Sequence, residues 1–553
     1  MNLTGSGAEL VYLPLGGAGE IGMNLSLYGF GGKWLMVDLG VSFGDDTMPM
    51  IDVVMADPEW IAERRDDLVG LVVTHGHEDH LGAIQYLWER LGCPVWATPF
   101  SASILRNKLH ETGLQGRVPL NVVELGSRFT AGPFDIEMIS VTHSIPEPNV
   151  LAIRTPVGTV IHTGDWKFDP DPLLGLPTDF EALRRAGKEG VLALVGDSTN
   201  VFSRGHTGSE SQVRASLIGL LGRYDGRVAV SCFATNVARL ESIAVAAAAN
   251  DRNVALVGRS LWRIDKAARE NGYLSDLPPF LTEHDAGYLP KDKVLYICTG
   301  SQGEPRAALA RIASGDHPHV TLGKGDVVIF SSRIIPGNEK PIYHLQNELV
   351  RLGVEVVTEK DEFVHVSGHP AREDMQEMYR LVRPRIAVPV HGEARHLQEH
   401  ARLARSCGVA EAVEIVNGDV LRLAPGPAEV VDHVATGRLC QDGPRIVRLD
   451  SEILRNRRRM VFNGSAVVTV VLDKAGRLLG DPQLTALGLL DSAHEAEEHE
   501  VVVEAVRDAV EELPLKARRD DGVVREAARL AVRRSLRDSH GKKPITEVHL
   551  VRV

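Results

Sequence analysis

The chain has 553 residues, 44% of them hydrophobic and 24% charged, and its formal net charge is −13. This length predicts two or three domains, and the composition is that of an ordinary globular protein. We find no apolar run of membrane-spanning length and no charged-then-apolar leader, which disfavours membrane-embedded and secreted classes and predicts a cytoplasmic location.

Five dispersed cysteines without a C-x-x-C pair argue against a disulfide framework and for a reducing compartment. The negative net charge disfavours broad nonspecific binding to nucleic acid. It leaves room for a local basic groove, or for a site whose positive charge comes from bound metals.

The first predicted strand, residues 10–15, runs into the glycine-rich text GGAGEIG at 16–22. A dinucleotide-binding loop would require a helix after these glycines. Residues 23–28 and 33–37 instead read as further strands, so a nucleotide loop is disfavoured. Asp38 ends the second of these strands, where it either orients a neighbouring histidine ligand or caps a turn.

The strongest chemical signal is the text THGHEDH at 74–80. It follows an apolar strand at 68–73 and precedes a predicted helix at 81–91. Three imidazoles and a carboxylate therefore lie in one turn at the end of a strand, where α/β proteins present ligands. Histidine and carboxylate together suit a divalent ion such as Zn²⁺ or Mn²⁺.

Several later strands also end in ligand-type side chains. Apolar segments at 95–97, 121–125, 134–140, 150–154 and 157–162 predict a largely β layer. Two of these strands run into His143 and Asp165, and a further strand at 191–195 runs into Asp197.

From about residue 210 the pattern becomes a βα alternation, which predicts a separate parallel-sheet domain. Helices are expected at 211–221, 237–250 and 261–271, and strands at 227–231, 253–257, 294–298 and 326–330. Ligand-type residues return at 365–369 and again at His391, which follows a strand at 385–389. A site domain interrupted by an inserted domain is therefore expected.

The text PGP at 425–427 predicts a hinge followed by a linker. Strands at 466–472 and 546–552, with helices near 494–512 and 522–537, then predict a small α/β domain. No metal or nucleophile cluster is apparent in it.

The order Asp38, H-x-H-x-D-H, His143, Asp165 and His391 resembles the metallo-β-lactamase superfamily, and the insertion resembles its nucleic-acid-processing β-CASP branch. The texts PLGGAGEIGMN, THGHEDHLGA, VTHSIPE, HTGDWKFD, GDSTN and HVSGHP…PVHGEARHL are similar to the bacterial ribonuclease J family over nearly the whole chain. The resemblance implies an αββα sandwich at 1–210 and 366–425, a β-CASP α/β domain at 211–365, a linker at 426–458 and a small C-terminal α/β domain at 459–553.

By this resemblance, seven side chains hold two divalent metals: His75, His77 and His143 the first, Asp79, His80 and His391 the second, with Asp165 bridging them. Two metals can clamp the attacking and leaving oxygens of a phosphodiester and stabilise the charge that develops. The ligand types allow either Zn²⁺ or Mn²⁺.

We expect Asp79, Asp197 and His369 to be the catalytic residues. His369 is the candidate general acid for the leaving 3′-oxygen, with Asp197 orienting it or keeping it protonated. The alternative is that Asp197 caps a turn and His369 only contacts phosphate.

The residues at 365–369 offer imidazole, hydroxyl and backbone N–H donors just before a predicted helix, and this arrangement is suited to binding an anion. In the related ribonucleases this segment grips the phosphate of the terminal nucleotide, which here implies His365, Val366, Ser367, Gly368 and His369. A companion phosphate loop is expected at Ala234, Thr235 and Asn236, although an ordinary strand-end turn is the open alternative. The basic run at 455–459 either contacts RNA or is solvated.

The resemblance implies a two-metal ribonuclease that removes nucleotides from the 5′ end of single-stranded, 5′-monophosphorylated RNA, with additional endonuclease activity, in RNA maturation and decay. It also implies dimers or tetramers, contacts with other RNA-decay proteins and, as in some relatives, a structural Ca²⁺ near Asp442 and the loop at 43–51. The alternatives are the same chemistry on DNA ends or at a fixed RNA site, a small-molecule hydrolase, and a non-catalytic subunit.

Overall fold

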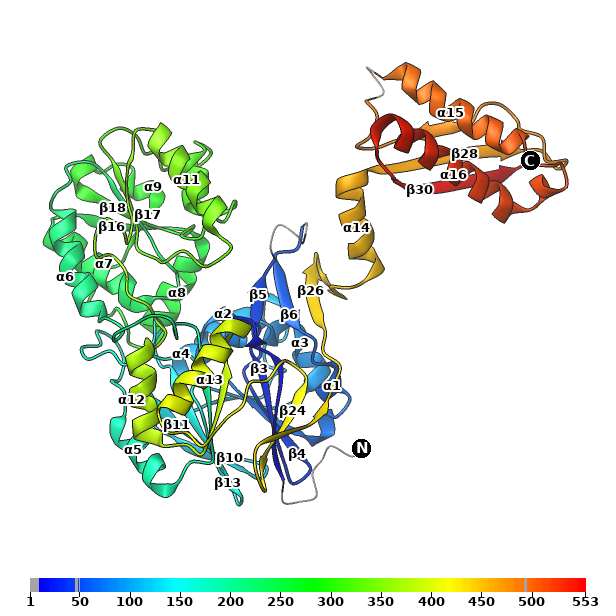
Figure 1. The fold of residues 1–553 in the computed structure, drawn as a ribbon. Coiled ribbons are helices and arrows are strands. Elements are labelled where there is room, and N and C mark those ends of the chain that lie inside the picture. The colour runs from blue at the N-terminus through cyan, green and yellow to red at the C-terminus, as the bar shows by residue number, and fades with distance from the viewer. Residues whose placement is uncertain (1–8, 45–47, 49, 492–494) are drawn as a thin grey trace. The chain divides into compact units, whose positions relative to one another are not determined.

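The computed structural model describes residues 9–44, 48, 50–491 and 495–553 (Figure 1). The chain forms two compact units, one of Met1–Ser42 with Met55–Gly437 and one of Phe43–Val54 with Arg438–Val553. Within the described ranges, none of the helices has both the length and the apolar character that crossing a bilayer requires. All five cysteines are free thiols.

The first unit contains an eight-stranded mixed sheet whose order is β25-β24-β1-β3-β4-β7-β8-β9. Its strands, in that order, are Glu429–His433, Asp419–Ala424, Leu10–Gly16, Leu25–Phe30, Lys33–Val37, Leu68–Val72, Val95–Ala97 and Leu120–Val122. Helices α1 (Glu59–Ala62), α2 (Glu78–Leu81), α3 (Ile84–Leu91) and α4 (Pro99–Glu111) connect its parallel part.

A second, seven-stranded sheet has the order β10-β11-β12-β13-β14-β21-β23. Its strands are Arg128–Ala131, Phe134–Ser140, Asn149–Thr155, Gly158–His162, Ala193–Asp197, Ile386–Val390 and Glu411–Ala412. Strand β21 comes from beyond the insertion and pairs in parallel with β14, so both halves of the site domain share one sheet. A short pair, β2 (Ala18–Gly19) with β22 (Gly392–Glu393), adds a further link.

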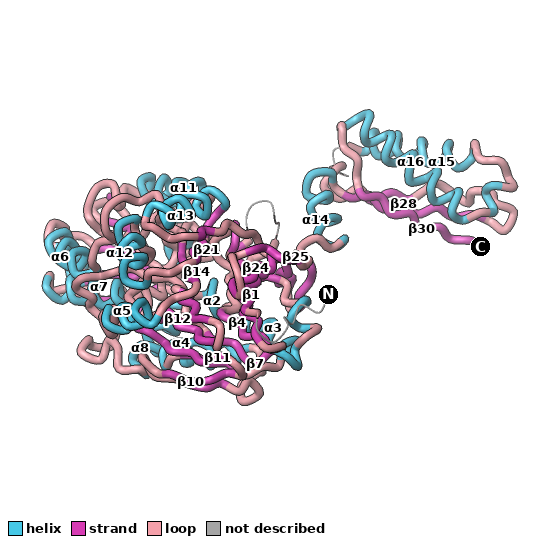
Figure 2. The backbone as a smooth tube through the Cα atoms, turned by 60° about the horizontal axis from the view of Figure 1, so that its bottom comes forward, coloured by secondary structure: helices cyan, strands magenta, loops and turns pink. Residues whose placement is uncertain are grey.

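The two sheets face each other across a continuous apolar core, to which the first contributes Tyr12 and Leu35 and the second Ile136 and Ile153. The other face of the second sheet is covered by α5 (Phe180–Glu189), α12 (Arg372–Val382) and α13 (Ala394–Ser406), which bury their apolar sides against it. Figure 2 shows the strands gathered between α5 and α12 on one side and α3 on the other. The expected αββα sandwich is confirmed.

The inserted segment forms an all-parallel six-stranded sheet of order β17-β16-β18-β15-β19-β20, as the βα alternation predicts. These strands are Leu281–Thr282, Asn253–Val257, Val294–Cys298, Val228–Ser231, Val327–Phe330 and Glu355–Val357. Its helices are α6 (Glu210–Leu221), α7 (Val237–Ala249), α8 (Arg259–Glu270), α9 (Glu283–Ala286), α10 (Ala308–Ala313) and α11 (Glu339–Arg351), drawn mostly in green in Figure 1.

The second unit ends in a three-stranded sheet of order β29-β28-β30, in which β28 and β30 are parallel. Helices α15 (Ala496–Glu511) and α16 (Asp521–His540) pack their valines on this sheet of β28 (Ser465–Leu472), β29 (Gln483–Thr485) and β30 (Ile545–Arg552). The expected start of the first helix, at 494, lies outside the described residues.

Residues 426–458, expected to be a linker, have regular structure for much of their length. Strand β25 pairs with β24 and completes the first sheet. After it come the hairpin β26 (Arg438–Asp442) and β27 (Arg445–Arg448), which joins a small sheet with β5 (Val41–Phe43) and β6 (Val53–Ala56), and then α14 (Glu452–Asn463). The sequence predicts a linker here because strands β25, β26 and β27 are short and partly exposed and therefore show little apolar periodicity.

Two helical features also differ from the prediction. The helix expected at 81–91 is split into α2 and α3, because the Ala83 N–H bonds the Leu39 carbonyl at 3.0 Å instead of continuing the helical ladder. Helix α4 was not predicted, although Pro99 at its first position is a common start signal.

Candidate active site

The candidate ligands all stand just beyond the carboxyl ends of strands. Strand β7 leads into the turn at 74–80, β13 leads to Asp165, and β21 leads to His391. Asp38 and His391 have positive φ angles of 62° and 51°, which non-glycine residues rarely adopt. Backbone strain of this kind persists where the surrounding structure imposes it, and it often marks functional sites.

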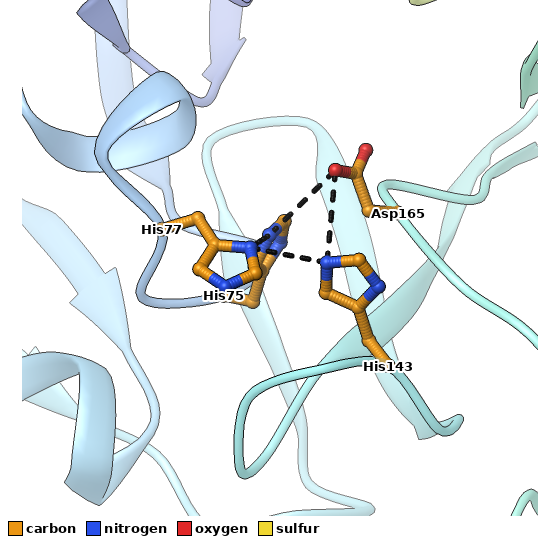
Figure 3. Close-up of side chains that lie close together, drawn as sticks. All are labelled: His75, His77, His143 and Asp165. Atoms are coloured by element: carbon orange, nitrogen blue, oxygen red, sulfur yellow. Dashed lines mark hydrogen bonds and ion pairs between the residues drawn. The ribbon is translucent and has the colours of Figure 1, made fainter. Parts of the chain in front are cut away.

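Three imidazoles form a first cluster (Figure 3). His77 Nδ1 lies 3.1 Å from His75 Nε2 and 3.0 Å from His143 Nε2, and Asp165 Oδ2 faces the latter two at 3.9 and 3.8 Å. Burial is the main cause that lowers the pKa of all three, to about 4 for His77. The rings are therefore neutral near pH 7, and their converging lone pairs suit a cation.

The second cluster pairs carboxylates with imidazoles. Asp79 Oδ2 lies 3.2 Å from His391 Nε2 and 3.5 Å from His80 Nε2, while Asp165 Oδ2 lies 3.2 Å from His80 Nε2. Burial opposes charge on both histidines, but the neighbouring carboxylates outweigh it and raise the pKa of His80 and His391 well above the usual value. The ionised carboxylates thus favour positive charge in this cluster, which a divalent ion bound there would supply.

Asp165 belongs to both clusters. Ligand atoms of His75, His77, His143 and Asp165 lie within 4.8 Å of one another, and so do those of Asp79, His80, Asp165 and His391. Its Oδ1 atom is buried without a hydrogen-bond partner. Its nearest charged neighbour is His391 Nε2 at 3.7 Å. Because a buried carboxylate oxygen without a hydrogen bond is costly, this atom and the two donor sets fit a pair of divalent ions around Asp165.

Outer partners fix the orientation of the candidate ligands. Asp38 accepts from the Thr74 N–H and hydroxyl, each at 2.8 Å, and contacts His80 Nδ1 at 2.7 Å. The Thr199 hydroxyl donates to Asp197 at 2.7 Å and lies 2.9 Å from His391 Nδ1. Each contact places the ring proton on Nδ1 and leaves Nε2 free to bind a metal. Asp38 is therefore placed where an orienting partner is needed.

His369 and Asp197 meet across 172 residues of sequence. His369 Nδ1 lies 2.8 Å from Asp197 Oδ2. Burial lowers the pKa of His369, but the charges of Asp197 and Asp165 outweigh that effect and the pKa is raised. The same imidazole lowers the pKa of Asp197 against the opposing effect of burial. The contact favours a protonated imidazole held by an ionised carboxylate.

The segment at 365–369 is held at several points. The Ser367 hydroxyl accepts hydrogen bonds from Asn200 Nδ2 at 2.7 Å and from the His369 N–H at 3.1 Å, so its own proton is free to donate. Thr207 donates to the His369 carbonyl at 3.0 Å. Val366 is buried and serves packing. The text around Asn200 and Thr207 contains common polar residues with no spacing signal, and sequence reasoning gave them no role.

The expected companion loop at 234–236 is engaged in local structure. Asn236 is buried and caps α7 by accepting from the Arg239 N–H at 2.9 Å, and its amide nitrogen faces Glu210 at 3.4 Å. Its side chain is thus occupied. Ala234 and Thr235 remain partly accessible beside the start of the helix.

Other polar residues have structural partners. Glu78, in the ligand turn, pairs with Lys108 at 2.6 Å. His400 lies 2.9 Å from both Ser198 Oγ and Tyr379 Oη, and His162 lies 2.9 Å from Tyr28 Oη. These buried contacts agree with structural roles for the two histidines.

The second unit differs from the sequence expectation in two respects. Asp442 is clamped by Arg457 at 2.9 and 3.1 Å and also contacts Arg445 at 3.1 Å, so two guanidinium groups occupy the carboxylate proposed for Ca²⁺. Part of the loop at 43–51 lies outside the described residues. Glu495, Glu498 and His540 come together in the C-terminal domain, where no such group was expected; exposed acidic groups of this kind are common without an ion.

Four known families match successive parts of the chain. They are described as "Metallo-beta-lactamase superfamily" at 20–218, "Ribonuclease J, beta-CASP domain" at 225–349, "Zn-dependent metallo-hydrolase RNA specificity domain" at 353–415 and "Ribonuclease J C-terminal domain" at 452–553. A crystal structure of a protein of unknown function from Enterococcus faecalis V583 shares the fold, with a TM-score of 0.54 and 14% identity over 75% of this chain and all of that one.

Characterised relatives extend the match over the full length. Ribonuclease J of Sinorhizobium meliloti is 46% identical over 550 residues, which cover 99% of this chain and 98% of the relative. Ribonuclease J of Thermus thermophilus is 35% identical over 92% of this chain and 90% of the relative. Ribonuclease J of Corynebacterium glutamicum is 40% identical over 87% of this chain and 67% of the relative. The chain therefore belongs to the ribonuclease J family of metal-dependent ribonucleases, within the metallo-β-lactamase superfamily.

Proposed function

We propose that this ribonuclease hydrolyses RNA from the 5′ end with two divalent metals, prefers single strands that carry a 5′-monophosphate, and also cuts internally. The observation that carries the proposal is the position of Asp165, which is shared by two donor clusters and has one buried oxygen that accepts no hydrogen bond. A single ion would leave one of the two clusters unused.

The residues have distinct roles in this proposal. When bound, the metals would supply Lewis acidity and activate an attacking water. His75, His77 and His143 would hold one ion, and Asp79, His80 and His391 the other, with Asp165 between them. Asp38 and Thr199 keep the imidazoles of the second group in the tautomer that presents Nε2.

His369 is the proposed general acid, and Asp197 is the residue that orients it and favours its protonated form. Their 2.8 Å contact leaves His369 Nε2 as the atom that would donate a proton to the leaving 3′-oxygen. His369 is partly exposed whereas Asp197 is buried, which suits a donor that must reach substrate and a partner that need not.

A preference for 5′-monophosphate is supported by the surroundings of His365. Burial, and then the positive charges of Arg239, Arg333 and Lys167, lower the pKa of His365 well below its usual value. Each of these side chains also pairs with a carboxylate, and the positive potential that they still exert at His365 favours an anion there. In the same segment, the Ser367 hydroxyl accepts two hydrogen bonds and can donate its own proton to a bound phosphate. A terminal phosphate bound here would place the first phosphodiester toward the metals.

The experiment that tests this activity compares matched substrates in the presence of Mn²⁺. We expect mononucleotide release from 5′-monophosphorylated single-stranded RNA, slower release from 5′-hydroxyl RNA, and little from DNA of the same sequence. A circular RNA, which has no ends, tests internal cutting. Equal or faster release from DNA would contradict the proposal, and a His77→Ala protein serves as the inactive control.

Further proposals concern the chain as a whole. We propose the expected limits of the inserted domain, 211–365, and of the C-terminal domain, 459–553, with the sandwich domain extended past 425 to include β25. We also propose a cytoplasmic role in RNA maturation and decay with other RNA-decay proteins, and self-association into dimers or tetramers. Exposed Val461 and Phe462 on α14 are consistent with an apolar contact between copies in the second unit. Light scattering on the full chain tests the oligomer, and metal analysis after purification tests Zn²⁺ against Mn²⁺.

A further inference from the structure

Arg239, on helix α7, is completely buried, which is rare for a charged side chain unless it is fully paired. Its Nε and Nη2 atoms donate to the two carboxylate oxygens of Glu210 at 3.0 and 2.9 Å. Burial opposes ionisation of Glu210, but the guanidinium outweighs it and lowers the pKa of that carboxyl. This bidentate pair fixes the guanidinium plane against the start of α6.

The remaining side of the guanidinium faces the segment that precedes His365. Its Nη1 lies 2.7 Å from both the carbonyl and the hydroxyl oxygen of Ser331, 3.1 Å from the Val364 carbonyl and 3.5 Å from His365 Nδ1. The Ser331 hydroxyl in turn donates to the Val364 carbonyl at 2.7 Å. One buried cation thus joins α6, the end of β19 and the segment at 364–365.

We propose that Arg239 is a positioning residue that holds the segment at 364–369 in the place where it binds the terminal phosphate of RNA. The inference rests on the proposed phosphate-binding role of His365 and Ser367. Arg239 itself does not contact the substrate, because none of its side chain is exposed. It acts by fixing the Val364 carbonyl, both through its own Nη1 donor and through the Ser331 hydroxyl that it holds.

The shape of the guanidinium accounts for the choice of arginine. Five donors in a rigid fork bind Glu210 and Ser331 at the same time, which the single ammonium of lysine cannot reproduce. A buried charge pair of this kind is weak evidence for added stability, because desolvation offsets much of the attraction. A role in placing the segment explains why a charged pair stands in this position.

Arg252 provides a matched control in the same inserted domain. It is also buried and donates to the carbonyls of Gly226 at 2.8 Å and Val294 at 3.2 Å. The contacts described for its side chain do not include the segment at 364–369. An Arg252→Lys variant therefore carries a comparable loss of buried hydrogen bonds without the proposed effect on phosphate.

The test measures kcat and KM of full-length Arg239→Lys, Ser331→Ala and Arg252→Lys on 5′-monophosphate and 5′-hydroxyl RNA of one sequence, below each protein's Tm. We expect Arg239→Lys to raise KM for the 5′-monophosphate RNA about tenfold, the loss of roughly one charge-assisted hydrogen bond, with kcat within about twofold. The preference over 5′-hydroxyl RNA should fall by the same factor. Ser331→Ala should raise KM for the 5′-monophosphate RNA, and lower the preference over 5′-hydroxyl RNA, by about threefold. Arg252→Lys should lower Tm and leave KM and the preference unchanged.

Folded Arg239→Lys and Ser331→Ala proteins that keep the wild-type preference would overturn the inference and leave the proposed phosphate site standing. If Arg239→Lys does not fold, Ser331→Ala decides the question, because it removes one hydroxyl and leaves the charge pair intact. A wild-type protein with equal KM for the two RNAs would overturn the proposed phosphate site and this inference with it.

Discussion

His143 Nδ1 lies 2.6 Å from the carbonyl oxygen of Gly368, to which it donates a hydrogen bond across 225 residues of sequence. The bond fixes the ring proton on Nδ1 and turns Nε2 toward the first donor cluster. It also joins that cluster to the segment that carries His369. The candidate metal centre and the candidate phosphate site are therefore held in one arrangement.

Gly368→Ala should disrupt this arrangement. A Cβ atom there would lie 2.8 Å from both Cε1 and Nδ1 of His143 and 2.9 Å from Ser144 Oγ, closer than real Cβ contacts allow. We expect nuclease activity to fall about tenfold or more, as when a partner of a metal-binding histidine is lost. The control is Gly219→Ala in helix α6, where nothing lies within 4 Å, and which should retain activity and gain up to about 1 kcal/mol in unfolding free energy. Equal activity in the two variants would contradict the close contact.

Removal of single ligands should separate the two metal positions. His77→Ala should lose the ion of the first cluster and keep part of the second, whereas Asp165→Asn should weaken both because it contributes to each. Metal content per chain after dialysis, measured by mass spectrometry, checks this. Circular dichroism verifies folding. A His77→Ala protein with full activity would refute the assignment.

Asp197→Asn should change the pH dependence of kcat. A general acid works in its protonated form, so activity falls as pH rises through the pKa of His369. The carboxylate of Asp197 is the largest cause that raises this pKa, against burial, and so the neutral amide should shift the alkaline limb to lower pH. At neutral pH we expect kcat to fall by about 10²-fold or more. If the alkaline limb does not move, a group other than His369 sets it and the assignment of His369 as the general acid is wrong.

Thr199→Val should weaken the second metal position. The variant keeps the side-chain shape but removes the hydroxyl that lies between His391 Nδ1 and Asp197. Loss of such a partner typically lowers metal affinity about 10–100-fold. Competition with a chelator measures the change. Thr112→Val, at an exposed helix end where the hydroxyl meets only backbone carbonyls, should match the wild type.

Local patterns were sufficient for much of the fold and for the candidate ligands. Strands such as Asn253–Val257 and Phe134–Ser140 match their predicted bounds, because an apolar run between turn residues is a local signal. The turn at 74–80 holds four candidate ligands in seven residues, so its chemistry is readable in one place. Helix α4 and the strands after residue 426 were missed because their apolar periodicity is weak.

The amino-acid sequence by itself determined most of the order of strands and helices up to residue 425, apart from helix α4, together with the identity of the family and the residue types that can bind metal. Only the tertiary structure decided which of these side chains meet. It placed His369 Nδ1 against Asp197, as Sequence analysis had expected, and it joined His143 to Gly368 and Thr199 to His391, which had not been expected. It also buried Arg239, which in the sequence reads as one basic residue among many. Such contacts join residues far apart in the chain, and they follow from how sheets and helices pack and not from any local spacing.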